Sequence, residues 1–303
     1  MKALITGACG FVGTYLVKVL LSNNIEVFGV DKTVKDKVNK VEYYELDILD
    51  KEALTKTLYD IKPDYIFHLA GIASVKFSWE NPELTHKINA EGTRCLLDAI
   101  PKNSDPRIFF ASTAEIYGIP KEVPLKETHE VNPQNPYAKS KLEAEKIIQN
   151  SKYVYIISRS FQHIGPGQSL GFVCPDFAKQ IAEIEKGEKE PIMYVGNLNA
   201  KRDFTDVRDI VNAYFLAMTK GIPGEIYNIC SGNAYLIQDI LQKLLDMSKV
   251  KIKVKEDPKR MRPVKIPVQV GDNSEFVKQT GWKPKISIEQ SLKDVLGSWR
   301  NRV

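Results

Sequence analysis

The sequence predicts an α/β protein with a doubly wound parallel sheet and a smaller, mixed α/β lobe in its C-terminal part. Two observations carry this prediction. Short apolar runs alternate with segments of helical periodicity through the first half of the chain, as in parallel sheets covered by helices on both faces. In addition, a glycine-rich turn joins the first apolar run to the first helical segment, where backbone N–H groups can meet a phosphate.

The expected strands are nearly continuous apolar runs, which suits strands that are buried on both faces. They cover residues 2–6, 26–30, 41–46, 64–70, 107–112 and 153–158. After about residue 160 proline and glycine become frequent, as in "IGPGQSLG", and the alternation ends. Residues 206–218 and 225–230 again look like a helix and a strand, and we expect them to return to the first sheet.

We therefore expect two lobes. The larger lobe would contain residues 1–160 and about 205–230, including the glycine-rich turn. The smaller lobe would contain residues of about 161–204 and 231–303 and would bind the substrate.

The composition, with 43% hydrophobic and 27% charged residues, indicates an ordinary globular protein. No apolar run reaches the roughly 18 residues of a membrane-spanning helix, and the N-terminal apolar run is too short for a signal peptide. The cysteines, at positions 9, 95, 174 and 230, are too far apart to indicate a zinc site or a disulfide framework. We therefore expect a cytoplasmic protein with no metal and no membrane partner.

The net charge of +5 arises partly from a lysine-rich segment near residue 250. Its lysines, at 249, 251, 253 and 255, alternate with Val250, Ile252 and Val254, which predicts a strand with one apolar face at the edge of a sheet. Because no aromatic residue lies between the lysines, we expect no nucleic-acid partner.

The turn "TGACGFVG" places Gly7, Gly10 and Gly13 after the first strand and at the start of the first helix. Its N–H groups can bind a diphosphate, and Gly13 allows the helix to approach the strand closely. Asp31 ends the second strand, where a carboxylate accepts hydrogen bonds from the adenosine ribose and repels a 2′-phosphate. The pattern predicts NAD as the cofactor, with NADH preferred, and Lys32 leaves the use of NADPH open.

Tyr137 and Lys141 lie four residues apart in "NPYAKSK", a spacing that places both side chains on one face of a helix. Asn135 and Pro136 are typical residues for the start of such a helix. A lysine ammonium near a phenol stabilises the phenolate and so lowers the pKa of the tyrosine. The pair can therefore donate and accept a proton near neutral pH, as carbonyl reduction or alcohol oxidation requires.

Further polar residues follow the ends of predicted strands. Thr113 and Glu115 stand in "FASTAEIYG", where a hydroxyl can orient a carbonyl oxygen and a carboxylate can remove a proton. Asp47 follows the third strand in "LDILD", where we expect a contact with the adenine edge or a helix cap.

Nearly the whole chain carries recognisable motifs, namely "TGACGFVG", "HLAGIASV", "NAEGTRCLLDA", "STAEIYG", "YAKSK", "IGPGQ" and "RDFTDVRD". Together they resemble the extended short-chain dehydrogenases/reductases of the nucleotide-sugar epimerase/dehydratase group. The resemblance implies a Rossmann-like fold in which Thr113 holds the substrate oxygen and Tyr137 is the acid/base. It also implies that Lys141 holds the nicotinamide ribose and that Asn89 supports the cofactor site. We expect further cofactor contacts from Phe11, Val12, Ile48, Leu69, Ala70 and Gly71.

Two later segments carry a more specific resemblance, to one branch of this family. They are "HIGPGQSLGFVCPDFAKQIAEIEKG" and "VGNLNAKRDFTDVRD". They are similar to GDP-sugar enzymes, above all to GDP-4-keto-6-deoxy-mannose reductases, which form GDP-rhamnose, and next to GDP-mannose 4,6-dehydratases. This similarity implies a GDP-sugar substrate whose C4 keto group is reduced with NAD(P)H. The family often has Asn where this chain has Gln162, which leaves the exact sugar open.

Three other functions stay open. A 4,6-dehydratase needs a second base, and Glu115 lies where the similar dehydratases carry one, although the similar reductases have an acidic residue there too. An epimerase of another nucleotide sugar is the second alternative. A catalytically inactive, cofactor-sensing regulator is a different class, which usually lacks the Tyr–Lys pair. The short chain, Asp31 and the similarity of residues 161–187 favour the reductase.

We expect Arg202 and Arg262 to bind the diphosphate of the substrate, because guanidinium groups form bidentate hydrogen bonds with its oxygens. The resemblance also implies a homodimer that pairs the helices near residues 90–100 and 137–150 in a four-helix bundle. Further residues are expected near the sugar and the base: Ser112, Gln162, His163, Val173, Phe177 and Lys179.

Overall fold

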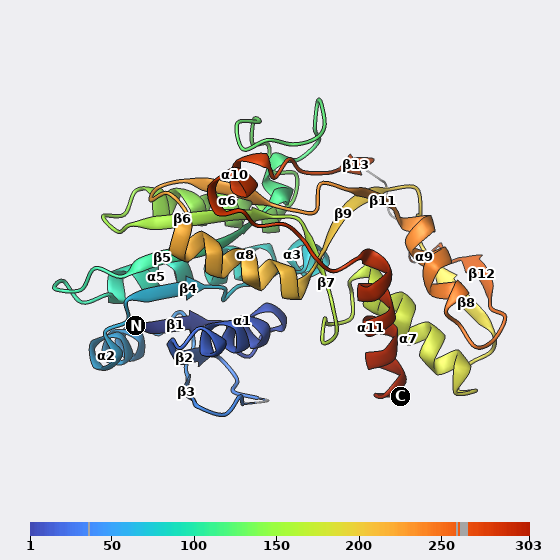
Figure 1. Ribbon diagram of the computed structural model, residues 1–303, viewed down its shortest axis with the longest axis horizontal. Helices are drawn as coiled ribbons and strands as arrows, with labels where there is room; N and C mark the ends of the chain where they lie inside the picture. The colour runs from blue at the N-terminus through green and yellow to red at the C-terminus, as the bar shows by residue number, and fades with distance from the viewer. Residues whose placement is uncertain (36, 259, 261–265) are drawn as a thin grey trace.

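The computed structural model describes residues 1–35, 37–258, 260 and 266–303, and its largest element is a sheet of seven strands. Figure 1 shows this sheet with helices on both faces and the second lobe beside it. The strand order is β10-β6-β5-β4-β1-β2-β3, and every neighbouring pair is parallel. The predicted fold class is thus confirmed. The strands are β1 (Lys2–Thr6), β2 (Glu26–Asp31), β3 (Val41–Glu45), β4 (Tyr65–His68), β5 (Arg107–Thr113), β6 (Tyr155–Ser160) and β10 (Ile226–Ile229).

Helices cover both faces of this sheet, as the apolar runs predicted, but the residues of the edge strand β3 stay partly or fully exposed. One face packs against α1 and α8 through residues such as Leu16 and Ile210. The other packs against α2, α5 and α6 through residues such as Leu54, Leu96 and Ile148. Fully burying such a side chain contributes about 1.5–3 kcal/mol, so the two layers hold the strand ends in fixed positions. These helices are α1 (Phe11–Ser22), α2 (Lys51–Ile61), α5 (Gly92–Ala99), α6 (Pro136–Gln149) and α8 (Val207–Lys220).

Shorter elements lie mostly at the carboxyl ends of the strands, where parallel sheets bind their ligands. No helix of the described residues is both long and apolar enough to cross a membrane. The shorter elements are α3 (Val75–Glu80), α4 (Pro82–His86), a π-helical turn η1 (Lys87–Glu91), a 3-10 turn η2 (Ala114–Tyr117) and α10 (Ser274–Thr280).

The second lobe has its own hydrophobic core, formed between three helices and two small sheets. Strand β9 pairs with β11, β13 and β7, whereas β8 and β12 form a separate pair. Figure 1 shows the helices α7, α9 and α11 of this lobe on the right. Their bounds are α7 (Val173–Glu185), α9 (Ile237–Asp246) and α11 (Ile288–Arg300), and the strands are β7 (Gln162–Ile164), β8 (Ile192–Val195), β9 (Lys201–Asp206), β11 (Ala234–Leu236), β12 (Lys253–Glu256) and β13 (Val268–Gln269).

The lysine-rich strand differs from its prediction. Strand β12 covers only Lys253–Glu256, and all four of its residues are exposed. Val254 is 39% exposed and Val250 is 40% exposed, and Ile252 packs against the core of the second lobe. The expected apolar face is therefore incomplete, because a two-stranded sheet offers little surface on which to bury it.

The chain leaves the second lobe after β9, returns to the first sheet with α8 and β10, and then enters the second lobe again. Helix α8 packs in the same core as α1, and β10 pairs with β6. The C-terminal part also contributes, because Phe276 of α10 and Trp282 lie in this core as well. We keep the division into two lobes as a proposal, with the change that residues near 274–282 pack with the first lobe.

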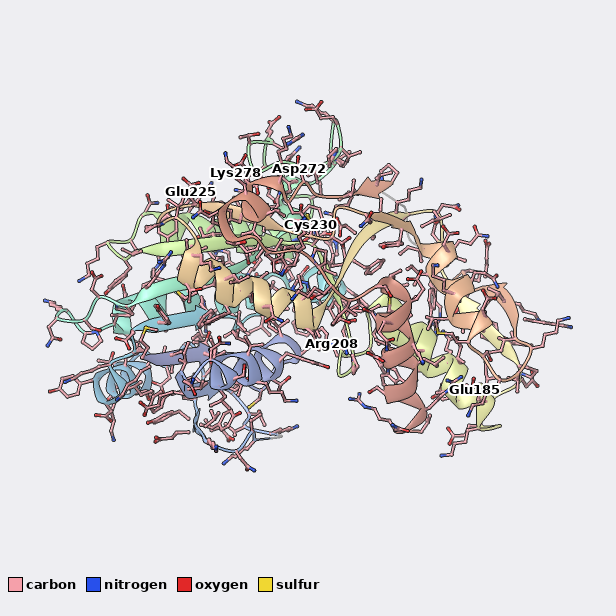
Figure 2. The ribbon with its side chains drawn as sticks, viewed as in Figure 1. Glu185, Arg208, Glu225, Cys230, Asp272 and Lys278 are labelled. Carbon is pink, nitrogen blue, oxygen red and sulfur yellow. The ribbon has the colours of Figure 1, made fainter. Side chains whose placement is uncertain are left out.

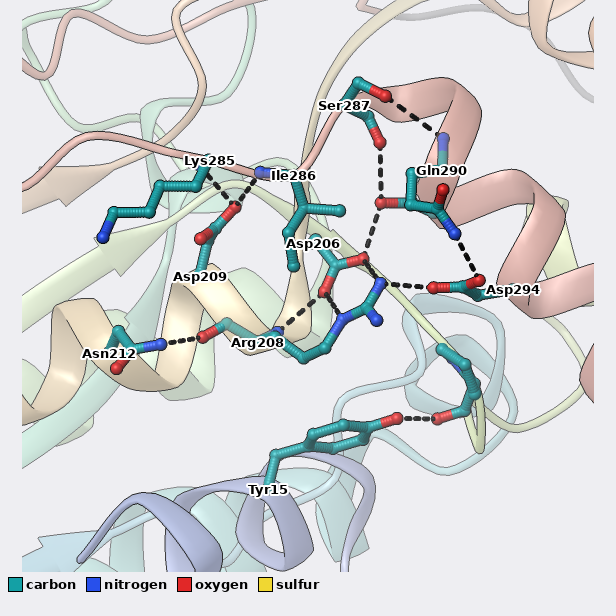
Figure 3. A network of polar contacts seen from close by, with 12 residues as sticks. Tyr15, Asp206, Arg208, Asp209, Asn212, Lys285, Ile286, Ser287, Gln290 and Asp294 are labelled. Carbon is teal, nitrogen blue, oxygen red and sulfur yellow. Dashed lines mark hydrogen bonds and ion pairs between the residues drawn. The ribbon is translucent and has the colours of Figure 1, made fainter. Parts of the chain in front are cut away.

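A polar network joins the two lobes where β9 runs into α8 (Figure 3). Asp206 accepts hydrogen bonds from Arg208 at 2.8 Å and from Ser291 of α11 at 2.6 Å. Arg208 also pairs with Asp294 at 2.7 Å. Figure 2 shows Arg208 between the lobes and Glu185 at the C-terminal end of α7. Because Asp206 is buried, these bonds anchor α11 to the start of α8.

Candidate active site

The glycine-rich turn has the conformation that the motif predicted. Gly7 has a φ of +73°, and a Cβ on it would lie 2.9 Å from the backbone N of Ala70. A Cβ on Gly13 would lie 2.2 Å from the carbonyl oxygen of Gly7, and the turn closes with a Gly10 N to Gly7 O hydrogen bond of 3.1 Å. The turn is therefore a tight backbone cradle at the N-terminus of α1, which fits a diphosphate.

A hydrogen bond joins the end of β2 to this turn. The backbone N–H of Cys9 donates to Asp31 Oδ2 at 2.9 Å. Next to it, Lys32 donates to Asp47 at 2.9 Å, and this hydrogen bond lowers the pKa of Asp47. Asp47 also accepts from the backbone N–H of Leu49 at 3.0 Å. Thus Asp31 lies beside the cradle, and Lys32, the next residue, has an acidic partner.

Asn89 holds the loop that follows β4. Its Oδ1 accepts from the backbone N–H of Ile72 at 2.7 Å, and its Nδ2 donates to the Ile72 carbonyl at 3.1 Å and to Ser140 Oγ of α6 at 2.9 Å. Asn89 lies in the π-helical turn η1, an irregularity that is frequent at functional sites. The loop contains Leu69, Ala70 and Gly71, so Asn89 fixes it against α6.

The remaining residues expected at the cofactor differ in exposure. Phe11 and Val12 begin α1 and are partly exposed. Ile48 is buried and packs in the core between the sheet and α2 and α5, so little of its surface is available to a ligand.

Thr113 and Tyr137 meet at the end of β5. Asn135 and Pro136 start α6, with Asn135 Oδ1 accepting from the N–H of Ala138 at 2.8 Å, as predicted for the start of this helix. The hydroxyl groups of Tyr137 and Thr113 are in hydrogen-bond contact. Together they can hold one carbonyl oxygen between two hydroxyl donors.

The pKa of Tyr137 differs from the prediction. The loss of hydration around its hydroxyl raises the pKa well above the ordinary value, the hydrogen bond with Thr113 lowers it, and the charge of Glu115 raises it again. Lys141 is not among the causes, so the expected lowering of the tyrosine pKa is absent in the chain alone. The phenol is therefore protonated at neutral pH, which suits a proton donor to a carbonyl oxygen.

Lys141 lies one helical turn after Tyr137 and is only 6% exposed. Its Nζ stands 4.1 Å from the centre of the Phe110 ring. Burial lowers the pKa of Lys141 to about 7, against the opposing effect of Glu145. The lysine can therefore gain or lose a proton near neutral pH.

This lowered pKa should appear as a pH dependence of stability. The unfolded chain keeps this proton up to a pKa of 10.5, whereas the folded protein loses it near pH 7. Relative to Lys141→Met, the free energy of unfolding of the cofactor-free protein should therefore rise by up to about 1.4 kcal/mol per pH unit above pH 7. Urea denaturation between pH 7 and 9 measures this difference, and parallel curves for the two proteins would contradict it.

Glu115 faces residues from both lobes. Its Oε2 accepts from Asn135 Nδ2 at 3.1 Å, and its backbone N–H donates to Thr113 Oγ1 at 3.2 Å. Its charge acts on both Tyr137 and Arg202. Arg202 donates through Nη1 to the backbone carbonyls of Lys201 and Ile266 at 2.8 and 2.9 Å, and within the described part of the chain its other guanidinium N–H groups can bind an anion. Burial lowers the pKa of Arg202.

A buried ion pair that no sequence pattern above predicted supports α6. Glu145 pairs with Arg159 of β6 at 3.0 Å, and Ser112 donates a hydrogen bond to the same carboxylate. The hydroxyl of Ser112, expected at the substrate, is thus bound to Glu145 and buried. Glu145 follows Lys141 and Tyr137 at a spacing of four residues, a regularity that could have revealed it.

The residues expected at the sugar and the base come from β7 and α7. Gln162 donates to Gln269 at 2.9 Å, and His163 Nε2 lies 3.2 Å from the hydroxyl of Tyr214. Burial lowers the pKa of His163 to about 4, so this ring is neutral near pH 7.

The structure does not bring all of these residues to the same place. Phe177 is 5% exposed and packs in the core of the second lobe, and Val173 packs beside that core. Lys179 pairs with Glu183 on the same helix at 3.4 Å. Arg262 lies outside the described residues. Among the described residues, no group of three or more His, Cys, Asp or Glu could hold a metal ion.

The fold is the Rossmann-like fold of short-chain dehydrogenases/reductases, with Thr113 at the end of β5 and Tyr137 and Lys141 one turn apart on α6. The family model described as GDP-mannose 4,6 dehydratase matches residues 4–295, and the chain belongs to this family. A GDP-6-deoxy-D-mannose reductase of Pseudomonas aeruginosa is 33% identical over 309 residues, covering 100% of this chain and 98% of the relative.

A dehydratase and a solved structure are also similar to this chain. A GDP-mannose 4,6-dehydratase of Vibrio cholerae is 27% identical over 347 residues, covering 97% of this chain and 92% of that protein. The structure of RMD from Pseudomonas aeruginosa complexed with NADPH has a TM-score of 0.88 at 31% identity, covering 100% of this chain and 99% of the other.

Proposed function

We propose that this protein reduces the C4 keto group of a GDP-linked 4-keto-6-deoxy hexose, converting GDP-4-keto-6-deoxy-mannose to GDP-rhamnose with NADH, or less well with NADPH. One observation carries the proposal: the hydroxyls of Tyr137 and Thr113 meet at the end of β5, in a chain that matches a GDP-6-deoxy-D-mannose reductase over its whole length. The protein would thus be a nicotinamide-dependent nucleotide-sugar oxidoreductase, with a small-molecule GDP-sugar as its partner.

Each residue of the candidate site has its own role in this reaction. The glycine-rich turn and Asp31 hold the diphosphate and the adenosine ribose of the cofactor, and Lys141 and Asn89 support its nicotinamide end. A bound nicotinamide coenzyme supplies the hydride. Thr113 and Tyr137 both donate to the C4 oxygen, and Tyr137, protonated at neutral pH, gives its proton as negative charge develops there. Arg202 binds the diphosphate of GDP.

The lengths of the two alignments favour the reductase over the dehydratase. The alignment with the reductase spans 309 residues, close to the 303 of this chain, whereas that with the dehydratase spans 347 and so requires long gaps. The dehydratase stays as a second candidate because of Glu115, whose carboxylate lies close enough to raise the pKa of Tyr137. A base at this position is what removal of the C5 proton would need.

The test is incubation with GDP-mannose alone, and then with a known 4,6-dehydratase and NADH, with the products analysed by NMR. We expect GDP-rhamnose only when the dehydratase is present. Conversion of GDP-mannose by this protein alone to the 4-keto-6-deoxy sugar, with solvent deuterium at C5 that is lost in Glu115→Gln, would instead establish the dehydratase.

Asp31 should decide the preference between the two coenzymes. Its carboxylate lies beside the glycine-rich turn, where it repels a 2′-phosphate, and Lys32 is held by Asp47. We expect NADH to bind more tightly than NADPH. In Asp31→Ala the difference between the two affinities should become smaller. Fluorescence titration of both coenzymes measures this. Equal affinities in the wild-type protein would contradict the prediction.

We also propose a homodimer and a cytoplasmic location. The expected interface is built from α5 and α6, which cover one face of the sheet side by side and carry exposed charged residues such as Arg94 and Lys146. Pairing these helices with those of a second copy would form a four-helix bundle. Analytical ultracentrifugation would show a dimer that a charge reversal at Arg94 weakens, and a monomer at micromolar concentration would exclude it.

A further inference from the structure

Two glutamines meet at the turn that follows β5. Gln162 Nε2 of β7 donates to Gln269 Oε1 of β13 at 2.9 Å, and Gln269 Nε2 donates to the carbonyl oxygen of Ala114 at 3.3 Å. Ala114 lies between Thr113 and Glu115, so this chain of hydrogen bonds reaches the catalytic turn from the second lobe. We call Gln162, Gln269 and Ala114 the glutamine relay.

The relay determines how each amide is oriented. A backbone carbonyl oxygen only accepts hydrogen bonds, so Gln269 must turn its NH₂ group toward Ala114. Its oxygen then accepts from Gln162, which must turn its own NH₂ group toward Gln269. Gln269 is 0% exposed, so no solvent competes for these bonds. The orientation of Gln162 therefore depends on a residue 107 positions later in the chain.

This orientation leaves one acceptor unused. The Oε1 atom of Gln162 is buried and has no hydrogen-bond partner among the described residues. A buried acceptor without a donor is unfavourable, so a ligand that brings a donor gains affinity there. The hydroxyl groups of a sugar are such donors. An Asn at this position would be shorter by one methylene group and could not reach as far.

We propose that Gln269 is a positioning residue, which fixes the amide of Gln162 so that Gln162 Oε1 accepts a hydrogen bond from a hydroxyl of the sugar. The inference rests on the proposed function for the identity of the sugar. It assigns to Gln269 a part in choosing the substrate through Gln162, to which the side chain of Gln269 is hydrogen-bonded, as it is to Ala114.

The experiment compares GDP-4-keto-6-deoxy-mannose with its 2-deoxy and 3-deoxy analogues in the wild-type protein, Gln162→Met and Gln269→Leu. Wild-type protein should lose about tenfold to a hundredfold in kcat/KM with one of the two analogues, since that analogue lacks the hydroxyl that donates to Gln162 Oε1. In Gln162→Met this discrimination should vanish. In Gln269→Leu it should fall to a few-fold, although Gln162 is still present.

Gln168 offers a matched control. It is also a buried glutamine whose Nε2 donates to a backbone carbonyl, that of His163, at 3.0 Å, but it is outside the relay. Gln168→Leu should lower thermal stability and keep the discrimination. If Gln269→Leu only lowers stability and keeps the wild-type discrimination, Gln269 is structural and the proposal is wrong. Unchanged discrimination in Gln162→Met would overturn it as well.

A failure of the proposed reaction would look different. If wild-type protein reduces none of these 4-keto sugars, their reduction kinetics are replaced by calorimetric binding of GDP-mannose and its 2-deoxy and 3-deoxy analogues, with the same variants and criteria. Discrimination in binding without turnover would support the relay and refute only the reductase. Turnover without discrimination, or binding without discrimination, would refute the relay.

Discussion

Tyr137→Phe should reduce turnover of the 4-keto sugar by about 10²–10⁴-fold, the usual contribution of general acid catalysis. The ring keeps its place at the start of α6, but the group that gives a proton to the C4 oxygen is lost. Binding of NADH should change little, because the glycine-rich turn and Asp31 are untouched. Steady-state rates with NADH oxidation followed at saturating substrate measure the effect.

Another tyrosine provides the control. Tyr227 lies in the core of the first lobe, and its hydroxyl accepts from the backbone N–H of Ile222 at 3.0 Å, far along the chain from the site. Tyr227→Phe should alter stability alone. If Tyr137→Phe keeps most of the activity while Tyr227→Phe behaves as expected, Tyr137 is not the proton donor.

Thr113→Val should lower kcat by about 10²–10³-fold, as the removal of one oxyanion donor does in other enzymes. Valine has nearly the shape of threonine, so β5 and the start of the 3-10 turn keep their packing. The lost hydroxyl touches Tyr137 and also accepts from the N–H of Glu115. The loss should therefore fall on kcat more than on KM, because charge on the C4 oxygen grows only in the transition state.

Thr113→Ser serves as the matched variant, since it restores the hydroxyl without the methyl group. We expect it to recover most of the rate. A Thr113→Val protein with kcat within a few-fold of wild type would show that Tyr137 alone holds the carbonyl oxygen. For comparison, Glu115→Gln should lower reduction by roughly tenfold or less, equivalent to ~1.4 kcal/mol of barrier.

Local sequence was enough to predict most of the first lobe. The seven-stranded sheet follows from apolar runs that alternate with helical segments, because each pattern reports the faces that its own element buries. The tight turn at Gly7 and Gly13 follows from residues that lack a Cβ, where any larger residue would meet the backbone. The start of α6 at Asn135 and Pro136 follows from capping chemistry within a single turn.

The second lobe was harder to predict, because its elements are short and pair over long distances. The lysine-rich strand shows this: its alternation predicted an apolar face, yet Val254 is 39% exposed, because among the described residues β12 pairs with β8 alone. Phe177 shows it as well, since an apolar residue on α7 can face either a ligand or the core. The packing of α9 and α11 directs it into the core.

By itself, the sequence selected the residues to which we assign the chemistry: the glycines of the turn, Thr113, Tyr137 and Lys141. Their roles depend on residue type and on spacings of a few positions, which backbone geometry converts directly into neighbours. Only the tertiary structure decided what surrounds them. It raised the pKa of Tyr137, lowered that of Lys141 to about 7, and placed Gln269 against Ala114, 155 residues away. Burial and contacts between distant segments are properties of the packed chain, so no local pattern could have expressed them.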